Sequence, residues 1–257
     1  MSLPDHQSQA SAESYILGGQ VRLRQPLKGH RAGTDAVLLA ACLPQTAQGV
    51  VLDIGAGVGA VGLAAAVRAP SIKVHLVERD AGQAEFARHN IALNGLQDRA
   101  HVTVADVLNA KSRRAEGLQD RMADIILTNP PFYKVGTVRA SPEQLKSEAY
   151  AMEASLEDWL RACAALLAPK GALYMVHLGS ALAQIVAATG SRFGDVQIIP
   201  VYSRPEEPAA RVLVRATKGS RAPPSILPGL IMHDGAAYSA QAEAILRGRA
   251  SIVFPKT

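Results

Sequence analysis

The sequence predicts an α/β fold with a seven-stranded, doubly wound, mostly parallel sheet and a closing antiparallel hairpin. Two observations lead to this prediction: apolar runs of strand length alternate with segments of helical spacing, and a glycine-rich turn follows the first such run. The expected strands are Val50–Ile54, Lys73–Val77, His101–Ala105, Asp124–Thr128, Ala172–His177, Val196–Val201 and Arg211–Ala216. The expected helices are Val58–Arg68, Gly82–Leu93, Leu156–Leu167, which should pack Trp159 on the sheet, and Ser180–Ala188.

Length and composition predict a single globular domain. Of 257 residues, 48% are hydrophobic and 19% charged, which is typical of a soluble protein and excludes a disordered or fibrous one. We expect an N-terminal extension over residues 1–47, a core over 48–218 and a C-terminal strand, turn and helix over 219–257. No apolar run reaches membrane-span length and Met1–Glu13 has no apolar signal core, so we expect a cytoplasmic protein without a membrane partner. The oligomeric state stays open.

The two cysteines do not indicate a metal site. Cys42 and Cys163 lie far apart inside apolar helical patterns, without the paired spacing of zinc ligands. Buried free thiols and no bound metal are therefore expected.

The charge is compatible with a polyanionic partner. The net charge of +5 favours nucleic acid weakly, and an ordinary solvated basic surface explains it equally well. Basic residues occur in three groups: Arg22, Arg24, Lys28, His30 and Arg31; Lys134, Arg139 and Lys146; and Arg211, Arg215, Lys218 and Arg221. Only clustering around one opening would favour nucleic acid over the ordinary interpretation.

The glycine-rich turn after the first strand is the first motif with chemical content. Gly55, Gly57 and Gly59 would let the backbone approach a ligand, and the spacing of Gly57, Gly59 and Gly62 also satisfies the dinucleotide fingerprint. Asp53, however, would repel a pyrophosphate and would suit a cationic ligand. S-adenosylmethionine carries an ammonium and a sulfonium. It is therefore the favoured ligand, with a dinucleotide or a plain turn as alternatives.

Acidic residues follow the next two expected strands. Glu78 ends the second strand, where a carboxylate can accept both hydroxyls of a ribose. Asp106 follows the third strand and offers an acceptor for an adenine amino group. Either residue alone could be a solvated loop acid, but their joint occurrence after consecutive strands favours a cofactor site.

The fourth strand runs into Thr128–Lys134, which contains Asn-Pro-Pro-Phe-Tyr. The Asn129 side-chain oxygen and the Pro130 carbonyl can accept the two hydrogens of a conjugated amino group and direct its lone pair toward a methyl donor. The prolines make the segment rigid, and Phe132 can stack on a planar substrate. Since Asn cannot take up a proton at neutral pH, its expected role is positioning and electrostatic stabilisation. A plain Asn-Pro-Pro turn is the alternative.

These motifs resemble the signature pair of the class I amino-methyltransferases, Asp-x-Gly-x-Gly followed by Asn-Pro-Pro-Phe. That Rossmann-like family includes enzymes for adenine N6, guanine N2 and the glutamine amide of release factors. Gly29–Leu39 and Asn90–Leu96 are similar to segments of the valine-tRNA adenine-N6 enzymes, and Leu230–Gly235 with Tyr238 and Ser239 resembles their closing strand, turn and helix.

The resemblance implies an S-adenosylmethionine-dependent N-methyltransferase that acts on a nucleobase in RNA, adenine N6 in tRNA above all, and releases S-adenosylhomocysteine. A guanine-N2 enzyme of rRNA and a glutamine-N5 enzyme of protein remain alternatives. Because a paired base is out of reach, the target should be single-stranded or flipped out. The motifs and the resemblance together assign Asn129, Pro130 and Phe132 to catalysis; Thr34, Asp53, Gly55, Gly57, Gly59, Glu78, Asp106 and Asn129 to the cofactor; and Arg31, Pro131, Tyr133 and Lys134 to the substrate.

Overall fold

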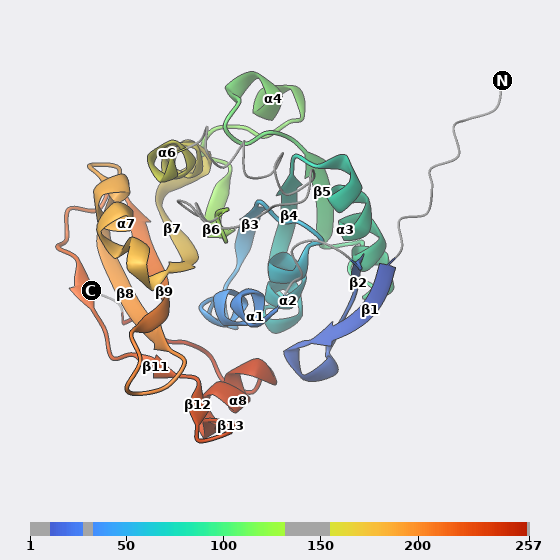
Figure 1. Ribbon diagram of the computed structural model, residues 1–257. Coiled ribbons are helices and arrows are strands. Elements are labelled where there is room, and N and C mark those ends of the chain that lie inside the picture. The colour runs from blue at the N-terminus through green and yellow to red at the C-terminus, as the bar shows by residue number, and fades with distance from the viewer. Residues whose placement is uncertain (1–10, 28–32, 132–154, 256–257) are drawn as a thin grey trace, which may run out of the picture.

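The computed structural model describes residues 11–27, 33–131 and 155–255, and its centre is one twisted sheet (Figure 1). The seven predicted strands all form: β3 Gly49–Ile54, β4 Ile72–Glu78, β5 Ala100–Val104, β6 Ala123–Thr128, β7 Leu167–Leu178, β8 Phe193–Tyr202 and β9 Ala209–Lys218. Their order is β8-β9-β7-β6-β3-β4-β5. Neighbours from β7 to β5 are parallel, whereas β9 is antiparallel to β7 and β8, which confirms the closing hairpin.

The sheet contains two short strands besides the seven predicted from periodicity. Ser225–Ile226 (β10) and Leu230–Ile231 (β11) pair with β8, both in parallel, which brings the sheet to nine strands. Each added strand contains only two residues and lies beside Pro and Gly, so no periodic pattern announced it.

Helices cover both faces of the sheet. The predicted helices appear as α2 Ala60–Arg68, α3 Ala81–Leu93, α6 Leu156–Leu166 and α7 Leu182–Thr189, and the structure adds α1 Thr34–Ala41, α4 Ala110–Ala115 and the short 3-10 turn η2 Gly179–Ala181. Successive strand residues such as Val51 and Leu52 belong to opposite apolar clusters, as the alternation of a strand requires. One cluster packs α1, α2 and α3 on the sheet, and the other packs α6 and α7. Cys42 and Cys163 are buried and free, as predicted.

Two extensions flank the sheet. At the N-terminus, β1 Ser11–Ile16 and β2 Val21–Pro26 form an antiparallel hairpin around the 3-10 turn η1 Leu17–Gly19. At the other end, β12 His233–Asp234 and β13 Ala237–Tyr238 lead into α8 Ala240–Leu246, whose first turn is capped by Ser239. In the described part of the chain, no helix is long and apolar enough to cross a membrane.

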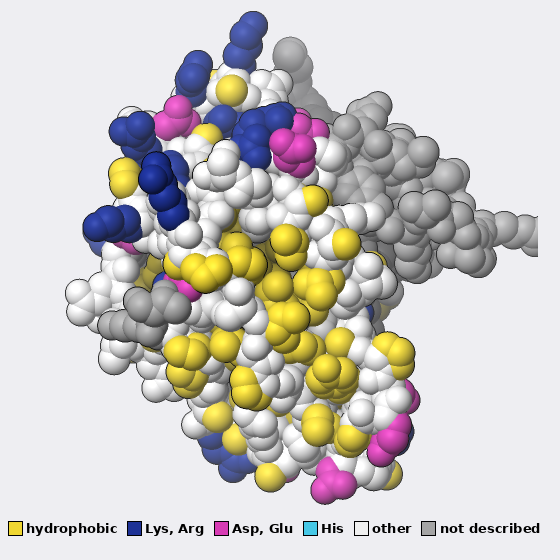
Figure 2. Space-filling view, turned by 90° about the vertical axis from the view of Figure 1, so that its left-hand side faces the viewer, with side chains coloured by type: hydrophobic (Ala, Val, Ile, Leu, Met, Phe, Trp, Pro, Cys, Tyr) yellow, Lys and Arg dark blue, Asp and Glu magenta, His cyan; other side chains and the backbone are white. Residues whose placement is uncertain are grey.

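The surface is not uniformly charged. Figure 2 shows apolar side chains across the middle of the face that carries α7, and Lys and Arg side chains gathered toward the end of the molecule where α4 lies. Val186 of α7 and Ile226 of β10 are among the exposed apolar residues. On this face, most of the Lys and Arg side chains thus lie toward the end with α4.

Candidate active site

The glycine turn and the Asn-Pro-Pro segment start at the same edge of the sheet. Strands β3 and β6 are parallel neighbours in which Asp53 pairs with Leu127 and Ile54 with Thr128. The chain therefore leaves both strands side by side, into the glycine turn and into Asn129. Glu78 ends β4, and Asp106 comes two residues after β5, so the four predicted motifs meet at the carboxyl ends of the parallel strands.

Backbone N–H groups of the glycine turn donate to carbonyl groups inside the protein. Gly55, Gly57 and Gly59 have φ of 74°, 54° and 87°, a left-handed conformation that Gly adopts without strain. The N–H groups of Gly55 and Ala56 donate to the Val77 carbonyl over 2.9 and 3.1 Å, and Gly59 N–H donates to Ala56 O over 2.8 Å. A pyrophosphate cradle needs such donors free, so this geometry disfavours the dinucleotide alternative.

Asp53 is buried beneath the turn. Its Oδ2 accepts the Gly62 N–H of α2 over 2.8 Å, and only 1% of the residue is exposed. Burial raises the pKa of the Asp53 carboxyl to about 7, against the lowering effect of the Gly62 hydrogen bond and with a further raising effect from the Glu78 charge. The side chain fixes the start of α2, and its contact with a cofactor remains a prediction.

Glu78 and Asp106 are both partly exposed carboxylates that also hold local backbone. Glu78 accepts Gly57 N–H at Oε2 and Asp80 N–H at Oε1, each over 2.8 Å. Asp106 Oδ1 accepts Leu108 N–H over 3.0 Å. Each carboxylate oxygen has a second lone pair, so these bonds are compatible with the predicted hydroxyl and amino contacts of a cofactor.

A hydrogen-bonded chain across three elements fixes the backbone next to Asn129. Thr128 Oγ1 donates to the Ile54 carbonyl of β3 over 2.9 Å and accepts the indole N–H of Trp159, on α6, over 2.9 Å. The sequence predicted the burial of Trp159 but not this contact. The same indole lies over the turn, where a Cβ on Gly55 would come within 3.2 Å of it.

Asn129 itself presents an unused acceptor. Its Oδ1 is buried and has no hydrogen-bond partner among the described residues. A buried amide oxygen without a partner is costly, and a ligand N–H would satisfy it. Pro130 is buried and Pro131 half-buried directly after it, whereas Phe132, Tyr133 and Lys134 lie outside the described residues.

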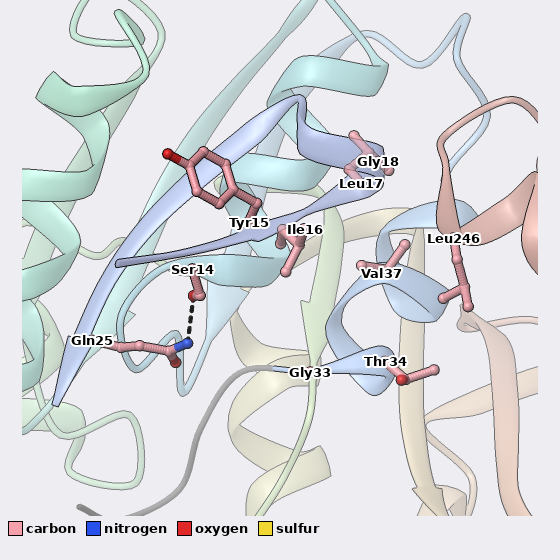
Figure 3. Close-up of a pocket in the computed structure, with 10 residues that line it drawn as sticks. All are labelled: Ser14, Tyr15, Ile16, Leu17, Gly18, Gln25, Gly33, Thr34, Val37 and Leu246. Atoms are coloured by element: carbon pink, nitrogen blue, oxygen red, sulfur yellow. Dashed lines mark hydrogen bonds between the residues drawn. The ribbon is translucent and has the colours of Figure 1, made fainter. Parts of the chain in front are cut away.

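Thr34 lies beside a cavity whose lining residues do not include Asp53, Glu78, Asp106 or Asn129. It is the exposed first residue of α1 and lines a cavity of about 330 Å³ between α1, the N-terminal hairpin and Leu246 of α8 (Figure 3). Tyr15, Gln25 and Val37 are among the other lining residues. The predicted cofactor contact of Thr34 stays a prediction, and Arg31 lies outside the described residues.

The basic group near the closing hairpin is mostly used inside the fold. Arg211 pairs with Asp35 over 3.0 Å, Arg215 with the buried Asp195 over 2.6 Å, and Lys218 donates to the Leu167 carbonyl over 2.6 Å. In the N-terminal group, Arg22 pairs with Glu13 and Arg24 donates to Ser11. The contacts of Arg211, Arg215 and Lys218 therefore give no support for nucleic-acid binding by this group. No cluster of metal-ligating side chains occurs within residues 11–27, 33–131 and 155–255.

The chain matches the family model described as "Methyltransferase small domain" over residues 31–199. Among curated relatives, the tRNA1(Val) (adenine(37)-N6)-methyltransferase of Porphyromonas gingivalis strain W83 is 33% identical over 180 residues, 66% of this chain and 69% of the relative. The enzyme of the same name from Aeromonas hydrophila is 30% identical over 193 residues, 74% of this chain and 77% of the relative.

Solved structures share the fold. A crystal structure from Agrobacterium tumefaciens, described as a predicted O-methyltransferase, superposes with a TM-score of 0.72 at 35% identity and covers 85% of this chain and 98% of its own. The TYW2 protein of P. horikoshii, solved in complex with MeSAdo, gives a TM-score of 0.54 at 15% identity, covers 83% of this chain and 73% of its own, and is similar in fold alone.

Proposed function

The chain belongs to the methyltransferase small domain family, and from that premise we propose that it transfers a methyl group from S-adenosylmethionine to N6 of an adenine in tRNA. The relatives of Porphyromonas gingivalis and Aeromonas hydrophila, whose names state this activity, match over 69% and 77% of their own length. The membership makes this chain a methyltransferase, and the acceptor is the part of the proposal that needs further support.

The observation that favours an amino group as the methyl acceptor is the unpaired Oδ1 of Asn129, at the edge shared with the glycine turn. An exocyclic amino group has two N–H donors. Asn129 Oδ1 would accept one and the Pro130 carbonyl the other, which holds the nitrogen lone pair perpendicular to the plane of the base. Since Asn129 cannot take up a proton, the proton of the product leaves to solvent.

The residues present fit S-adenosylmethionine. Asp53 and Glu78 place two carboxyl groups at the glycine turn, which suits a cationic ligand, and the internally bonded turn offers close approach without a phosphate cradle. Glu78 and Asp106 would hold the ribose and the adenine. When bound, S-adenosylmethionine supplies an electrophilic methyl group.

A hydroxyl acceptor is the second candidate, because one similar structure is described as a predicted O-methyltransferase. A hydroxyl offers only one hydrogen to two aimed acceptors and usually needs a base to remove it. The Asn129 amide is not such a base, and the carboxyl groups at this edge, Asp53, Glu78 and Asp106, are assigned to the cofactor. The pair of acceptors therefore supports nitrogen over oxygen.

Methylation of a defined RNA tests the proposal. The purified protein is incubated with labelled S-adenosylmethionine and a tRNA1(Val) transcript, and the nucleosides are analysed by mass spectrometry. We expect N6-methyladenosine, and we expect its loss when guanosine replaces adenosine 37. Parallel incubations replace the tRNA with rRNA or with a release-factor peptide, and label in guanine N2, in the glutamine amide or in a hydroxyl group would identify one of the alternatives. Because the proposed substrate is a tRNA, we also propose that the protein acts in the cytoplasm.

Replacement of Asn129, the proposed hydrogen-bond acceptor for the amino group, tests the proposal at the residue level. Asn129→Ala should lower kcat by at least about a hundredfold, as for the loss of one transition-state hydrogen bond, and should leave the Kd for S-adenosylmethionine within about twofold. Calorimetric titration and single-turnover kinetics measure the two quantities. Parallel losses in both would contradict the assignment of Asn129 to the acceptor.

A further inference from the structure

Asn90, in the last turn of α3, connects the N-terminal hairpin to the glycine turn. Its side chain is fully buried. Asn90 Oδ1 accepts Arg24 N–H over 2.7 Å, and Asn90 Nδ2 donates to Arg24 O over 3.0 Å, so the side-chain amide pairs with β2 as a neighbouring strand would. The second hydrogen of Nδ2 goes to the Val58 carbonyl over 2.9 Å. One side chain thus contacts two segments that are far apart in sequence.

The bond to Val58 matters because of where that carbonyl lies. Val58 stands between Gly57 and Gly59, both with positive φ, and glycine peptides can rotate more freely than others. The peptide between Val58 and Gly59 is held on both sides, by Asn90 at its carbonyl and by Ala56 O at its N–H. Gly57 N–H is held in turn by Glu78. Asn90 therefore completes the set of contacts that fixes the turn.

We propose that Asn90 is a positioning residue for the cofactor: it fixes the Val58 carbonyl, and with it the conformation of the glycine turn, against the N-terminal hairpin. The inference rests on the proposed binding of S-adenosylmethionine at this turn. It assigns a role to a residue that contacts neither cofactor nor substrate, and it couples cofactor affinity to the seating of β2 on α3.

Asn94, the partly exposed C-cap residue of α3, is a control that makes the same contacts with β2. Its side chain also makes three hydrogen bonds: Oδ1 accepts Arg22 N–H over 2.9 Å, and Nδ2 donates to Arg22 O and Asn90 O, each over 2.7 Å. Both side chains hold β2 in the same way. Only Asn90 also contacts the glycine turn, so a comparison of the two separates anchoring of the hairpin from positioning of the turn.

The first experiment uses the cofactor-free protein. Hydrogen exchange of the Gly57 and Gly59 amides should accelerate about tenfold in Asn90→Ala, because the carbonyl between them loses its partner, and should stay at the wild-type rate in Asn94→Ala. Equal exchange in the two variants would overturn the inference. This result does not depend on whether the protein binds S-adenosylmethionine.

The second experiment measures affinity. By calorimetry, the Kd for S-adenosylmethionine should rise about tenfold in Asn90→Ala and remain unchanged in Asn94→Ala, while kcat at saturating cofactor stays near that of the wild type. If Asn90→Ala does not fold, Asn90→Asp, which keeps the acceptor for Arg24 N–H but loses the donor to both Arg24 O and Val58 O, is compared with Asn94→Asp, which likewise loses its donor to Arg22 O. Equal weakening in each pair would reduce Asn90 to an anchor of the hairpin. A wild-type protein that does not bind the cofactor refutes the proposed function instead, and the exchange experiment still decides on Asn90.

Discussion

At the residue scale, the buried carboxyl of Asp53 should make stability depend on pH. Its folded pKa of about 7 lies above the ordinary value of 3.8, so the folded state binds the proton more tightly than the unfolded chain. The stability that depends on protonated Asp53 is fully present below about pH 4 and is lost as the pH rises through 7. The loss in unfolding free energy is a few kcal/mol, at about 1.4 kcal/mol per pKa unit. Asp53→Asn keeps an acceptor for Gly62 N–H and cannot ionise, so its unfolding free energy should be flatter over this range.

Urea unfolding at a series of pH values measures the difference. Asp106→Asn, at a partly exposed carboxylate, serves as the control and should follow the wild-type profile. Identical slopes for wild type and Asp53→Asn between pH 4 and 7 would show that another group governs the dependence.

The sequence predicted the position of a residue correctly where that residue lies at or just after the end of a predicted strand. Asp53, Glu78, Asp106 and Asn129 were predicted at one edge because parallel strands share a direction, and the register confirms that edge. The partners of these side chains were not predictable. That Asp53 and Glu78 bind backbone N–H groups depends on the path of the turn, which spacing does not give.

At the element scale, Trp159 of α6 should influence catalysis through β6. Its indole N–H bonds Thr128, which precedes Asn129, so Trp159→Phe would keep most of the packing and remove one buried hydrogen bond. We expect a stability loss of about 1 kcal/mol and a drop in kcat with nearly unchanged cofactor affinity. Thr128→Ser, which retains the hydroxyl, should behave like the wild type. An unchanged kcat in Trp159→Phe would mean that packing alone places the Asn-Pro-Pro segment.

Elements were predictable in proportion to their length and periodicity. The seven strands and four helices with clear periods were found, whereas the N-terminal hairpin, α1 and the two-residue strand β10 were not. A strand at Leu230, where β11 lies, was expected from the resemblance alone. Strand β2 alternates buried apolar and exposed basic residues from Val21 to Arg24, which is a strand pattern, but from the sequence Arg22 and Arg24 were interpreted only as part of a basic group. Besides β1, β2 pairs with the side-chain amides of Asn90 and Asn94 rather than with another strand, a pairing that no strand pattern encodes.

At the scale of the whole molecule, the net charge of +5 overstates the basic surface that is free for RNA. Arg211, Arg215 and Lys218 are engaged inside the fold. Exposed basic side chains remain on α4, which follows Asp106 at the carboxyl edge of the sheet, and Figure 2 shows Lys and Arg gathered toward that end. The geometry thus favours an RNA approach over α4.

Reversal of charge on α4 tests this orientation. Lys111 and Arg114 are both exposed, and a phosphate contact from each would release counterions, so Lys111→Glu with Arg114→Glu should weaken tRNA binding and reduce the salt slope of log K by roughly two. Lys73, exposed near the start of β4, lies at the amino edge of the sheet, and Lys73→Glu should leave both quantities unchanged. Fluorescence anisotropy at several salt concentrations measures them. Equal effects of the two replacements would indicate binding by overall charge, and a loss confined to Lys73→Glu would place the RNA on the opposite edge, away from Asn129.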